Sequence, residues 1–221
     1  MEPALLCAFT GDFNAYSNLA TVVKYADDIS VILPITSRNT DSNTEQIKKE
    51  VQQIDEWCSM NKLCLNKDKT NVMVQTRTPV TLPYFHTVND VKILGTIFSS
   101  NLTWDAQVSH AACKFNQRFH ILRKLKHVIS REELHQIYSS IMRPLLEYSS
   151  PVYVSLTEKL EKKIQRLNSR AHKLIWSGSK FKCHCEKEIL RKRREQASKV
   201  LFTQILAKPE HSLHRDLHQS E

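Results

Sequence analysis

The chain has 221 residues, of which 41% are hydrophobic and 25% are charged, so it can bury a sizeable core. It contains no apolar run of about 18 residues, and residues Met1 to Phe9 lack the basic flank and cleavage site of a signal peptide. We therefore expect an intracellular protein, nuclear or cytoplasmic, that is neither secreted nor membrane-spanning. Six scattered cysteines are too irregularly spaced for a disulfide scaffold.

The net charge of +9 is unevenly distributed along the chain. Residues 1–113 carry 9 Lys/Arg against 12 Asp/Glu, whereas residues 114–204 carry 21 Lys/Arg against 8 Asp/Glu. A basic second half favours contact with a polyanion such as nucleic acid. A lysine-rich helical surface that only contacts solvent explains the same numbers, so charge alone leaves both readings open.

The first half of the chain reads as strands with one helix. Residues 22–33 (VVKYADDISVIL) place an Asp-Asp tip between two β-favouring runs and predict a tight hairpin. Ser42-x-x-Glu45 resembles a capping box in front of a helix of about four turns. Further strands are predicted at 71–76 and 91–98, the second with Gly95 inside it, where a bulge or a close backbone approach is expected.

From Trp104 the apolar residues recur at helical spacing. They predict three helices, the second capped by Ser130-x-x-Glu133 and the third by Ser155-x-x-Glu158, which can bury their stripes as a small bundle. A further basic helix is predicted at 186–207. The expected fold class is α+β, with domains at 1–103 and 104–180 and a basic helix with a frayed tail at 181–221.

Asp27 and Asp28 are the strongest candidates for chemistry. Two carboxylates held close together repel each other unless a cation is present. Mg²⁺ prefers oxygen ligands, and two such ions can activate an attacking oxygen and stabilise a leaving one. Taken alone, however, Asp-Asp is also ordinary turn chemistry.

Four segments resemble, in order, the reverse transcriptase domain of non-long-terminal-repeat retrotransposons. Residues 22–32 around Tyr25-Ala26-Asp27-Asp28 are similar to its catalytic hairpin, and 63–70 (LCLNKDKT) to the segment after the palm helix. Residues 93–98 (ILGTIF) look like the primer-gripping strand pair, and residues 101–104 (NLTW) follow it as they commonly do in the family. Residues 143–153 (RPLLEYSSPVY) resemble part of the downstream helical region. The expected fold is therefore a truncated polymerase palm followed by an all-α, thumb-like bundle.

The resemblance implies roles for individual residues. Asp27 and Asp28 are expected to bind Mg²⁺ (or Mn²⁺) in the palm, and Lys69 matches the lysine proposed to protonate the pyrophosphate leaving group. Tyr25 is expected at the nucleic acid, and Gly95 at the primer backbone. Lys69 also reads as a solvated strand-edge lysine, and Gly95 as a plain bulge. The thumb residues expected to contact duplex phosphates are Lys114, Arg118, Arg123, Lys124 and Lys126.

In the full-length family the partners are an RNA template, a DNA primer and deoxynucleoside triphosphates. The family's third metal-binding aspartate and its fingers are not identified here, and the setting of Asp12 does not match that aspartate. We therefore expect a carboxy-terminal fragment of an RNA-directed DNA polymerase with little or no activity alone. A non-catalytic nucleic-acid-binding protein made from the same parts is the alternative, and a helical interaction protein with an incidental hairpin is a third reading.

Three further features of the sequence support only weaker predictions. Cys183-His184-Cys185 invites a zinc reading, but Cys-x-Cys is too tight for the usual ligand pair, so no zinc site is predicted. Core packing is the expected role of Trp57, Trp104 and Trp176. The run Arg191 to Arg194 reads as a nuclear localisation patch, a phosphate contact or a solvated helix face. The sequence does not predict an oligomeric state.

Overall fold

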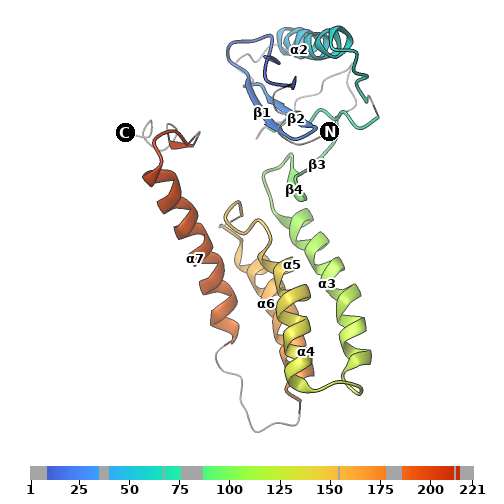
Figure 1. The fold of residues 1–221 in the computed structure, drawn as a ribbon, viewed down its shortest axis with the longest axis vertical. Helices are drawn as coiled ribbons and strands as arrows, with labels where there is room; N and C mark the ends of the chain where they lie inside the picture. The colour runs from blue at the N-terminus through green and yellow to red at the C-terminus, as the bar shows by residue number, and fades with distance from the viewer. Residues whose placement is uncertain are drawn as a thin grey trace. The chain divides into compact units, whose positions relative to one another are not determined.

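The chain divides into two compact units, residues 1–91 and 92–221, and each is described by itself (Figure 1). The α+β class predicted from the sequence is confirmed, since helices occur together with two small antiparallel hairpins. Within the described ranges, no helix is both long and apolar enough to cross a bilayer. The computed structural model describes residues 9–34, 40–66, 68–75, 87–153, 155–177, 186–211 and 213–214.

The predicted hairpin at the start of the first unit is confirmed. Strand β1 (Thr21–Tyr25) pairs antiparallel with β2 (Asp28–Ile32), with Tyr25 opposite Asp28 and Val22 opposite Val31. Because side chains alternate along a strand, one face of the hairpin carries Val22, Ile29 and Val31. That face packs on a small core formed by Phe13, Trp57 and Cys58.

Helix α2 (Thr40–Met60) provides most of this core and begins earlier than the sequence predicted. Ser42 therefore lies in the first turn of the helix and is not its cap, so the predicted capping box is wrong. The helix ends in a Schellman motif. The Leu63 amide donates to the Cys58 carbonyl at 2.8 Å, and the Lys62 amide donates to Ser59 at 3.2 Å. Lys62 has the left-handed φ of +56° that such an ending requires.

The strand predicted at 71–76 is not formed in the part of it that the structure describes. Residues 71–75 contain a single isolated bridge, from Val72 to Thr87, in which the Val88 amide donates to the Val72 carbonyl at 3.0 Å. The single strand predicted at 91–98 is wrong, whereas the pair of strands that the family resemblance implies at 93–98 is formed, as a hairpin of β3 (Asp90–Ile93) and β4 (Thr96–Ser99). Gly95 lies in its turn rather than inside a strand.

This second hairpin explains why the units divide at 91/92 and not near residue 104. The Ile97 amide donates to the Gln107 side chain at 2.9 Å, and the Phe98 ring lies edge-on to Trp104 with centroids 5.6 Å apart. Gln107 and Trp104 lie at the start of α3 (Asp105–Leu125), so β4 packs with the helices that follow it.

The core of the second unit joins α3 to α4 (Arg131–Ile137), α5 (Arg143–Glu147) and α6 (Glu158–Ile175), and α7 (Glu186–Ala207) adds Leu190. The buried side chains at its centre are Val108, Phe115, Leu122, Leu134, Tyr138, Met142, Leu146 and Ile175.

Helices α3 and α6 bury most of the apolar stripes that the sequence predicted for them. The stripe predicted for the second helix through Ile141 is wrong, because Ile141 is 47% exposed and Tyr138 and Met142 are buried instead.

Two predicted helix starts have different outcomes. The Ser130 capping box is confirmed, because the Ser130 hydroxyl accepts from the Glu133 amide and the Glu133 carboxylate accepts from the Ser130 amide. The predicted cap at Ser155 is wrong. Helix α6 starts two residues later, and the side chain that accepts from the Leu160 amide is that of Thr157, at 3.5 Å. Any Ser or Thr near the boundary can satisfy that amide, so the sequence pattern alone does not choose between them.

A π-helical turn, η1 (Tyr138–Met142), separates α4 from α5 where one continuous helix was expected. Pro144 has no amide hydrogen, and inside an α-helix its ring clashes with the carbonyl four residues earlier. The wider turn relieves this, because the Arg143 amide donates to the Tyr138 carbonyl five residues back.

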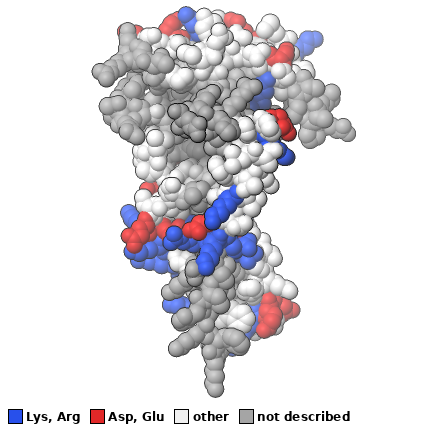
Figure 2. Space-filling view, turned by 90° about the vertical axis from the view of Figure 1, so that its left-hand side faces the viewer, with Lys and Arg blue, Asp and Glu red and all other residues white. Residues whose placement is uncertain are grey.

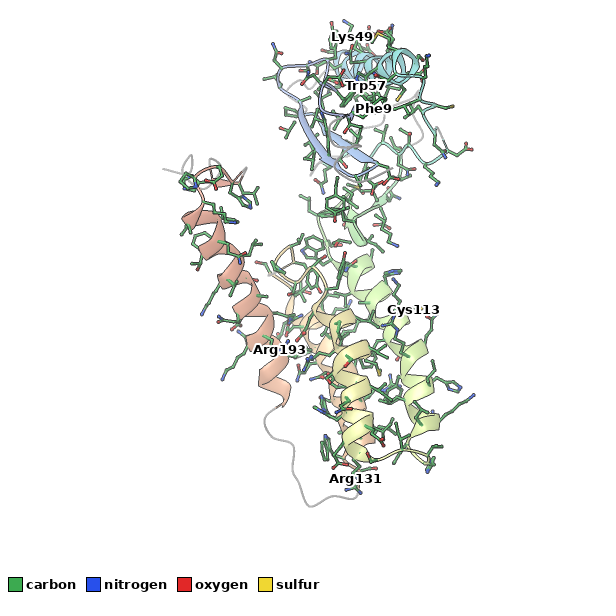
Figure 3. The ribbon with its side chains drawn as sticks, viewed as in Figure 1. Phe9, Lys49, Trp57, Cys113, Arg131 and Arg193 are labelled. Atoms are coloured by element: carbon green, nitrogen blue, oxygen red, sulfur yellow. The ribbon has the colours of Figure 1, made fainter. Side chains whose placement is uncertain are left out.

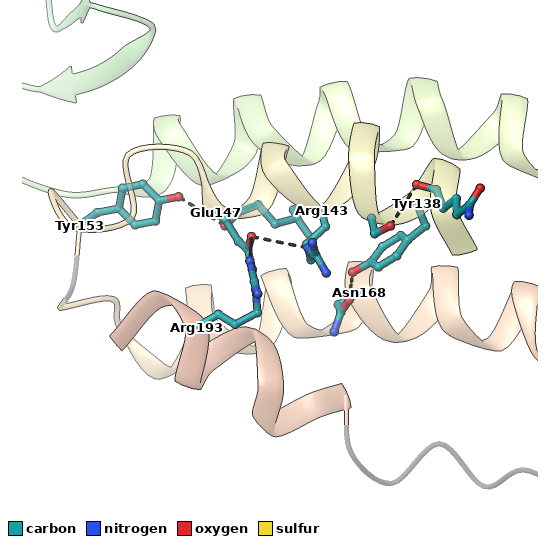
Figure 4. A network of polar contacts seen from close by, with 9 residues as sticks. Tyr138, Arg143, Glu147, Tyr153, Asn168 and Arg193 are labelled. Carbon is teal, nitrogen blue, oxygen red and sulfur yellow. Dashed lines mark hydrogen bonds and ion pairs between the residues drawn. The ribbon is translucent and has the colours of Figure 1, made fainter. Parts of the chain in front are cut away.

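Polar and aromatic side chains cross the core between η1 and α6. The Tyr138 hydroxyl donates to the Asn168 carboxamide (Figure 4). The Tyr138 ring lies edge-on to His172, with ring centroids 4.5 Å apart. His172 is 8% exposed. Burial, together with His135 and Arg143 nearby, lowers the pKa of His172 to about 4.

The low pKa of His172 predicts that the second unit, residues 92–221, called the helical unit from here on, is sensitive to acid. Between about pH 6.5 and 4 the unfolded chain binds this proton and the folded chain does not, so stability present above pH 6.5 is lost as the pH falls. We expect the His172→Phe variant to lose roughly 2 kcal/mol less free energy of unfolding over this range than the wild type. Urea unfolding followed by circular dichroism at several pH values measures the difference.

The control for this experiment is His120→Gln, because His120 is exposed on α3. An unchanged pH dependence in His172→Phe would contradict the assignment of the acid sensitivity to the buried imidazole.

Candidate metal and nucleic-acid sites

The two candidate metal ligands lie at the exposed tip of the β1–β2 hairpin. Ala26 and Asp27 form its two-residue turn, and Asp28 opens β2 opposite Tyr25. Tyr25, Asp27 and Asp28 are all exposed, Tyr25 at 64%. Since Tyr25 and Asp28 form the register pair beside the turn, they project from the face opposite the one that packs on Trp57. The predicted neighbours at the tip are therefore brought together and are open to solvent.

The face of the hairpin that carries Val22, Ile29 and Val31 is held in place by aromatic and polar contacts. Trp57 lies edge-on to Phe13 at 5.2 Å and to Phe9 at 6.4 Å, below α2 (Figure 3). The Lys24 ammonium donates to the carbonyl oxygens of Thr10, at 2.7 Å, and Gly11, at 3.3 Å. The strand that carries the tip is thus tied to the loop in front of it.

A buried carboxylate fixes the same loop to α2. Glu50 is 5% exposed, and its two oxygens accept from the backbone amides of Tyr16, at 2.9 Å, and Ser17, at 2.7 Å. Asp12 accepts from the Trp57 indole nitrogen at 3.3 Å, so its carboxylate already has a structural contact. These two acids therefore support the hairpin and are not placed as additional metal ligands.

The turn at the tip has an unfavourable backbone conformation. Ala26 has φ +53°, in the left-handed region, where a side chain other than glycine costs about 1–2 kcal/mol. Such conformations gather at functional sites, where the surrounding structure imposes them.

Lys69 is exposed in a turn of the same unit. Its backbone amide donates to the Asn66 carbonyl at 3.1 Å and to the Asn66 side chain at 3.2 Å, and the Thr70 hydroxyl donates to the same carbonyl. Asn66 therefore fixes the backbone of the turn and leaves the Lys69 ammonium at the surface. The neighbouring Lys67 lies outside the described residues.

Gly95 has a structural reason to be glycine. Its φ is +85°, and Leu94 before it has φ +47°, as two-residue hairpin turns of type I′ require. A Cβ atom at Gly95 would lie 3.1 Å from the hydroxyl oxygen of Tyr148, which donates to the Leu94 carbonyl at 2.5 Å. The close approach expected at this glycine is made by Tyr148.

The basic residues predicted on α3 do not form one surface. At 3.6 residues per turn, Lys114 and Arg118 lie on the opposite side of the helix from Arg123. Arg118 is half-buried and donates to the Ile141 carbonyl of η1 at 2.6 Å, so it stabilises the fold. Lys124 is exposed and Lys126 is half-buried at the end of the helix.

The helical unit does contain a continuous basic surface, which the sequence analysis missed. Five cations on α6 fall within about a quarter of its circumference, and the row extends for about 21 Å. Lys163 is half-buried, and the other four are exposed: Lys159, Arg166, Arg170 and Lys173. We call this surface the α6 basic row, and its members are Lys159, Lys163, Arg166, Arg170 and Lys173. Their spacing of three to four residues was readable from the sequence.

The row is fixed to α3 by two hydrogen bonds. Lys163 donates to the Ser109 hydroxyl at 2.9 Å, and Arg170 donates to the Asn116 side chain at 3.1 Å. The Arg170 guanidinium also lies 4.7 Å from the centre of the Phe119 ring. On α3, Arg123 follows Ser109 and Asn116 at steps of seven residues, so it extends the same side.

In the part of the chain that the structure describes, no three His, Cys, Asp or Glu side chains are grouped as a metal site. Cys183 and Cys185 lie outside the described residues. Of the three tryptophans, Trp57 is buried, and Trp104 and Trp176 pack partly buried against the helical core, as predicted. Comparison of the chain with family models, curated proteins and solved structures gives no match.

The strained turn predicts a stabilising substitution. We expect Ala26→Gly to stabilise the hairpin by about 0.5–1 kcal/mol, because glycine avoids the left-handed penalty but loses more chain entropy on folding. Hydrogen exchange at the β1 and β2 amides should slow by roughly two- to fivefold. Ala111→Gly inside α3 is the control of opposite sign, since it should cost about 1 kcal/mol. Faster hairpin exchange in Ala26→Gly would contradict the strained geometry.

Proposed function

We propose that the chain is derived from a retrotransposon reverse transcriptase, with a partial polymerase palm in the first unit and a thumb-like region in the second. The observation that carries the proposal is the exposure of Asp27 and Asp28 at the tip of a hairpin whose other face is fixed on Trp57. The ordered resemblance of four sequence segments to that family supports it. The assigned reaction is template-directed nucleotidyl transfer with divalent metal, in the context of the complete domain.

Each residue has a role in this proposal. Asp27 and Asp28 offer exposed carboxylate oxygens to Mg²⁺ or Mn²⁺, which prefer oxygen ligands and also bind substrate phosphates. The metal supplies charge neutralisation at the transferred phosphate. Lys69 presents an exposed ammonium that can pair with a phosphate and donate a proton. Tyr25 provides an exposed ring beside the acids, on which a base or sugar can rest.

A non-catalytic nucleic-acid-binding function is the second candidate, and the α6 basic row favours it. Its cations lie along one side of one helix, and two of them are held in place by Ser109 and Asn116. Such a row binds phosphates without reading bases. This function requires neither metal nor a complete palm.

The metal assignment predicts loss of Mn²⁺ binding in the double variant Asp27→Asn, Asp28→Asn. We expect the affinity for Mn²⁺, measured by electron paramagnetic resonance of the free ion, to fall at least tenfold, equivalent to about 1.4 kcal/mol. Glu45→Gln on α2 is the control, because it removes an exposed carboxylate of the same unit. Equal Mn²⁺ binding by all three proteins would reject Asp27 and Asp28 as ligands.

Primer extension on an RNA template tests activity with the same proteins. We expect little or no extension by this chain alone, because the family's third metal-binding aspartate is not identified in the sequence. Robust extension that disappears in Asp27→Ala would show a complete active site and contradict this part of the proposal.

The α6 basic row predicts duplex binding that depends strongly on salt. Each phosphate contact contributes about 0.9 to the slope of log affinity against log salt on B-form DNA. Replacing Arg166 and Lys173 by Gln should therefore flatten the slope by about 1.8 and weaken binding at low salt, measured by fluorescence anisotropy.

The matched control is Lys48→Gln with Lys49→Gln, which removes the same charge from α2. Equal losses in both double variants would mean that net charge, and not the row, determines binding. Indifference of the wild type to nucleic acid at low salt would favour a helical interaction protein instead.

A further inference from the structure

The run Arg191 to Arg194 on α7 is the most concentrated positive charge in the sequence, yet its side chains contact carboxylates of the chain itself. On the face drawn in Figure 2, Lys and Arg side chains gather in one band with Asp and Glu side chains beside them. Arg191 donates to Glu195 of its own helix at 2.8 Å. The next two arginines reach other helices.

Arg193 and Arg194 join α7 to the rest of the helical unit. The Arg193 guanidinium donates to both oxygens of Glu147 on α5, at 2.6 and 3.2 Å, in a two-pronged contact (Figure 4). Arg143 is a second cation beside that carboxylate, 3.6 Å away. Arg194 donates to Glu161 on α6. Glu147 and Glu161 thus hold the two arginines.

Apolar contact contributes little to the same attachment. Of the described α7 side chains, which begin at Leu190, the buried ones are Leu190, Arg194 and Ile205. Val200 and Phe202 are 45% and 51% exposed. From Leu190 onward α7 thus has few buried apolar side chains, so its ion pairs are a substantial part of its attachment there, and salt weakens such pairs.

The Arg194 contact is also incompletely satisfied. Its side chain is buried, but one terminal nitrogen, Nη1, has no hydrogen-bond partner. Burying a guanidinium with a missing hydrogen bond costs free energy, which opposes the gain from Glu161. This cost reduces the net free energy with which Arg194 holds α7 in its docked position.

We propose that α7 is an arginine latch: it closes on Glu147 and Glu161, withholds Arg193 and Arg194 from polyanions, and opens when phosphates compete for these arginines. Phosphate accepts the same bidentate hydrogen bonds from arginine as carboxylate does. The latch is an autoinhibitory contact, and its assignment to nucleic acid rests on the proposed function. Glu161 lies on the opposite side of α6 from the α6 basic row, so opening exposes two cations in addition to that row.

The test compares three full-length proteins. The first is the wild type, and the second is Glu147→Gln with Glu161→Gln, which removes both acids of the latch. The third is Glu132→Gln with Glu158→Gln, which makes the same charge change at exposed positions outside it. Because the two variants have equal net charge, any difference between them reports the latch.

The first measurement contains no nucleic acid. Hydrogen exchange at the α7 amides should be at least tenfold faster in Glu147→Gln, Glu161→Gln than in the control, because a released helix of this length frays. In the wild type it should accelerate as salt is added. Equal α7 protection in the two variants would overturn the latch, whatever the chain binds.

The second measurement is the salt dependence of binding to a DNA duplex. The latch variant should bind with a slope about 1.8 steeper than the control, because two more phosphates are contacted. Equal slopes, with α7 released, would overturn the withholding of Arg193 and Arg194. If none of the proteins binds the duplex, but α7 is released only in the latch variant, the proposed function fails and the latch is supported.

A second variant, which removes the arginines instead of the acids, checks that the effect of Glu147→Gln with Glu161→Gln is not due to misfolding. Arg193→Gln with Arg194→Gln should also release α7, but its duplex slope should remain no steeper than that of the wild type, because the withheld cations are gone. A steeper slope in this variant would contradict the proposal.

Discussion

The placement of Asp27 and Asp28 depends on how Trp57 and Phe13 hold one face of a two-stranded hairpin. A hairpin of two strands is marginally stable at best in water, so it cannot fix two repelling carboxylates by itself. Burial of Trp57 at 6% exposure and Phe13 at 1% exposure supplies the missing stability from one side only. The other face remains open, and Asp28 projects from it, with Asp27 exposed in the turn beside it.

A different constraint governs the helical unit, where contacts divide the basic residues into two kinds. Arg118 and Arg194 bind carbonyl and carboxylate groups of the fold and are partly or fully buried. Arg166 and Lys173 are exposed on α6. A count of charges treats all of them alike, so it overstates the positive charge available to a partner. The surface that can bind phosphate is narrower than the sequence indicates.

The elements that could be predicted from sequence are those determined by local patterns. The β1–β2 hairpin, the apolar stripes of α3 and α6 and the Ser130 capping box each depend on residues that are close together in the sequence. Residues 71–75 failed as a strand because β-favouring side chains form a strand only beside a partner, and here Val72 bridges Thr87 alone. A local sequence pattern does not show whether a strand has a partner elsewhere in the chain.

The same limitation applies to the candidate site. The position of Asp27 and Asp28 at a tip followed from the flanking strands, whereas the contact of Tyr148 with Gly95 joins residues 53 apart in the chain. The ion pairs of Arg193 and Arg194 likewise span 46 and 33 residues. The sequence therefore identified which residues could act, and the structure identified which of them are already engaged.

Both hairpin turns place a residue other than glycine in the left-handed region, Ala26 at φ +53° and Leu94 at φ +47°. The turn before β4 uses glycine where Tyr148 leaves no room for a side chain, so its geometry is explained by packing. The turn before β2 places exposed Ala26 in the left-handed region although no packing contact requires a small residue there. Alanine restricts the backbone more than glycine does, so Asp27 and Asp28 keep a narrower range of relative orientations. Metal ligands gain from that restriction, because the entropy of ordering them is lost in folding and not on binding the ion.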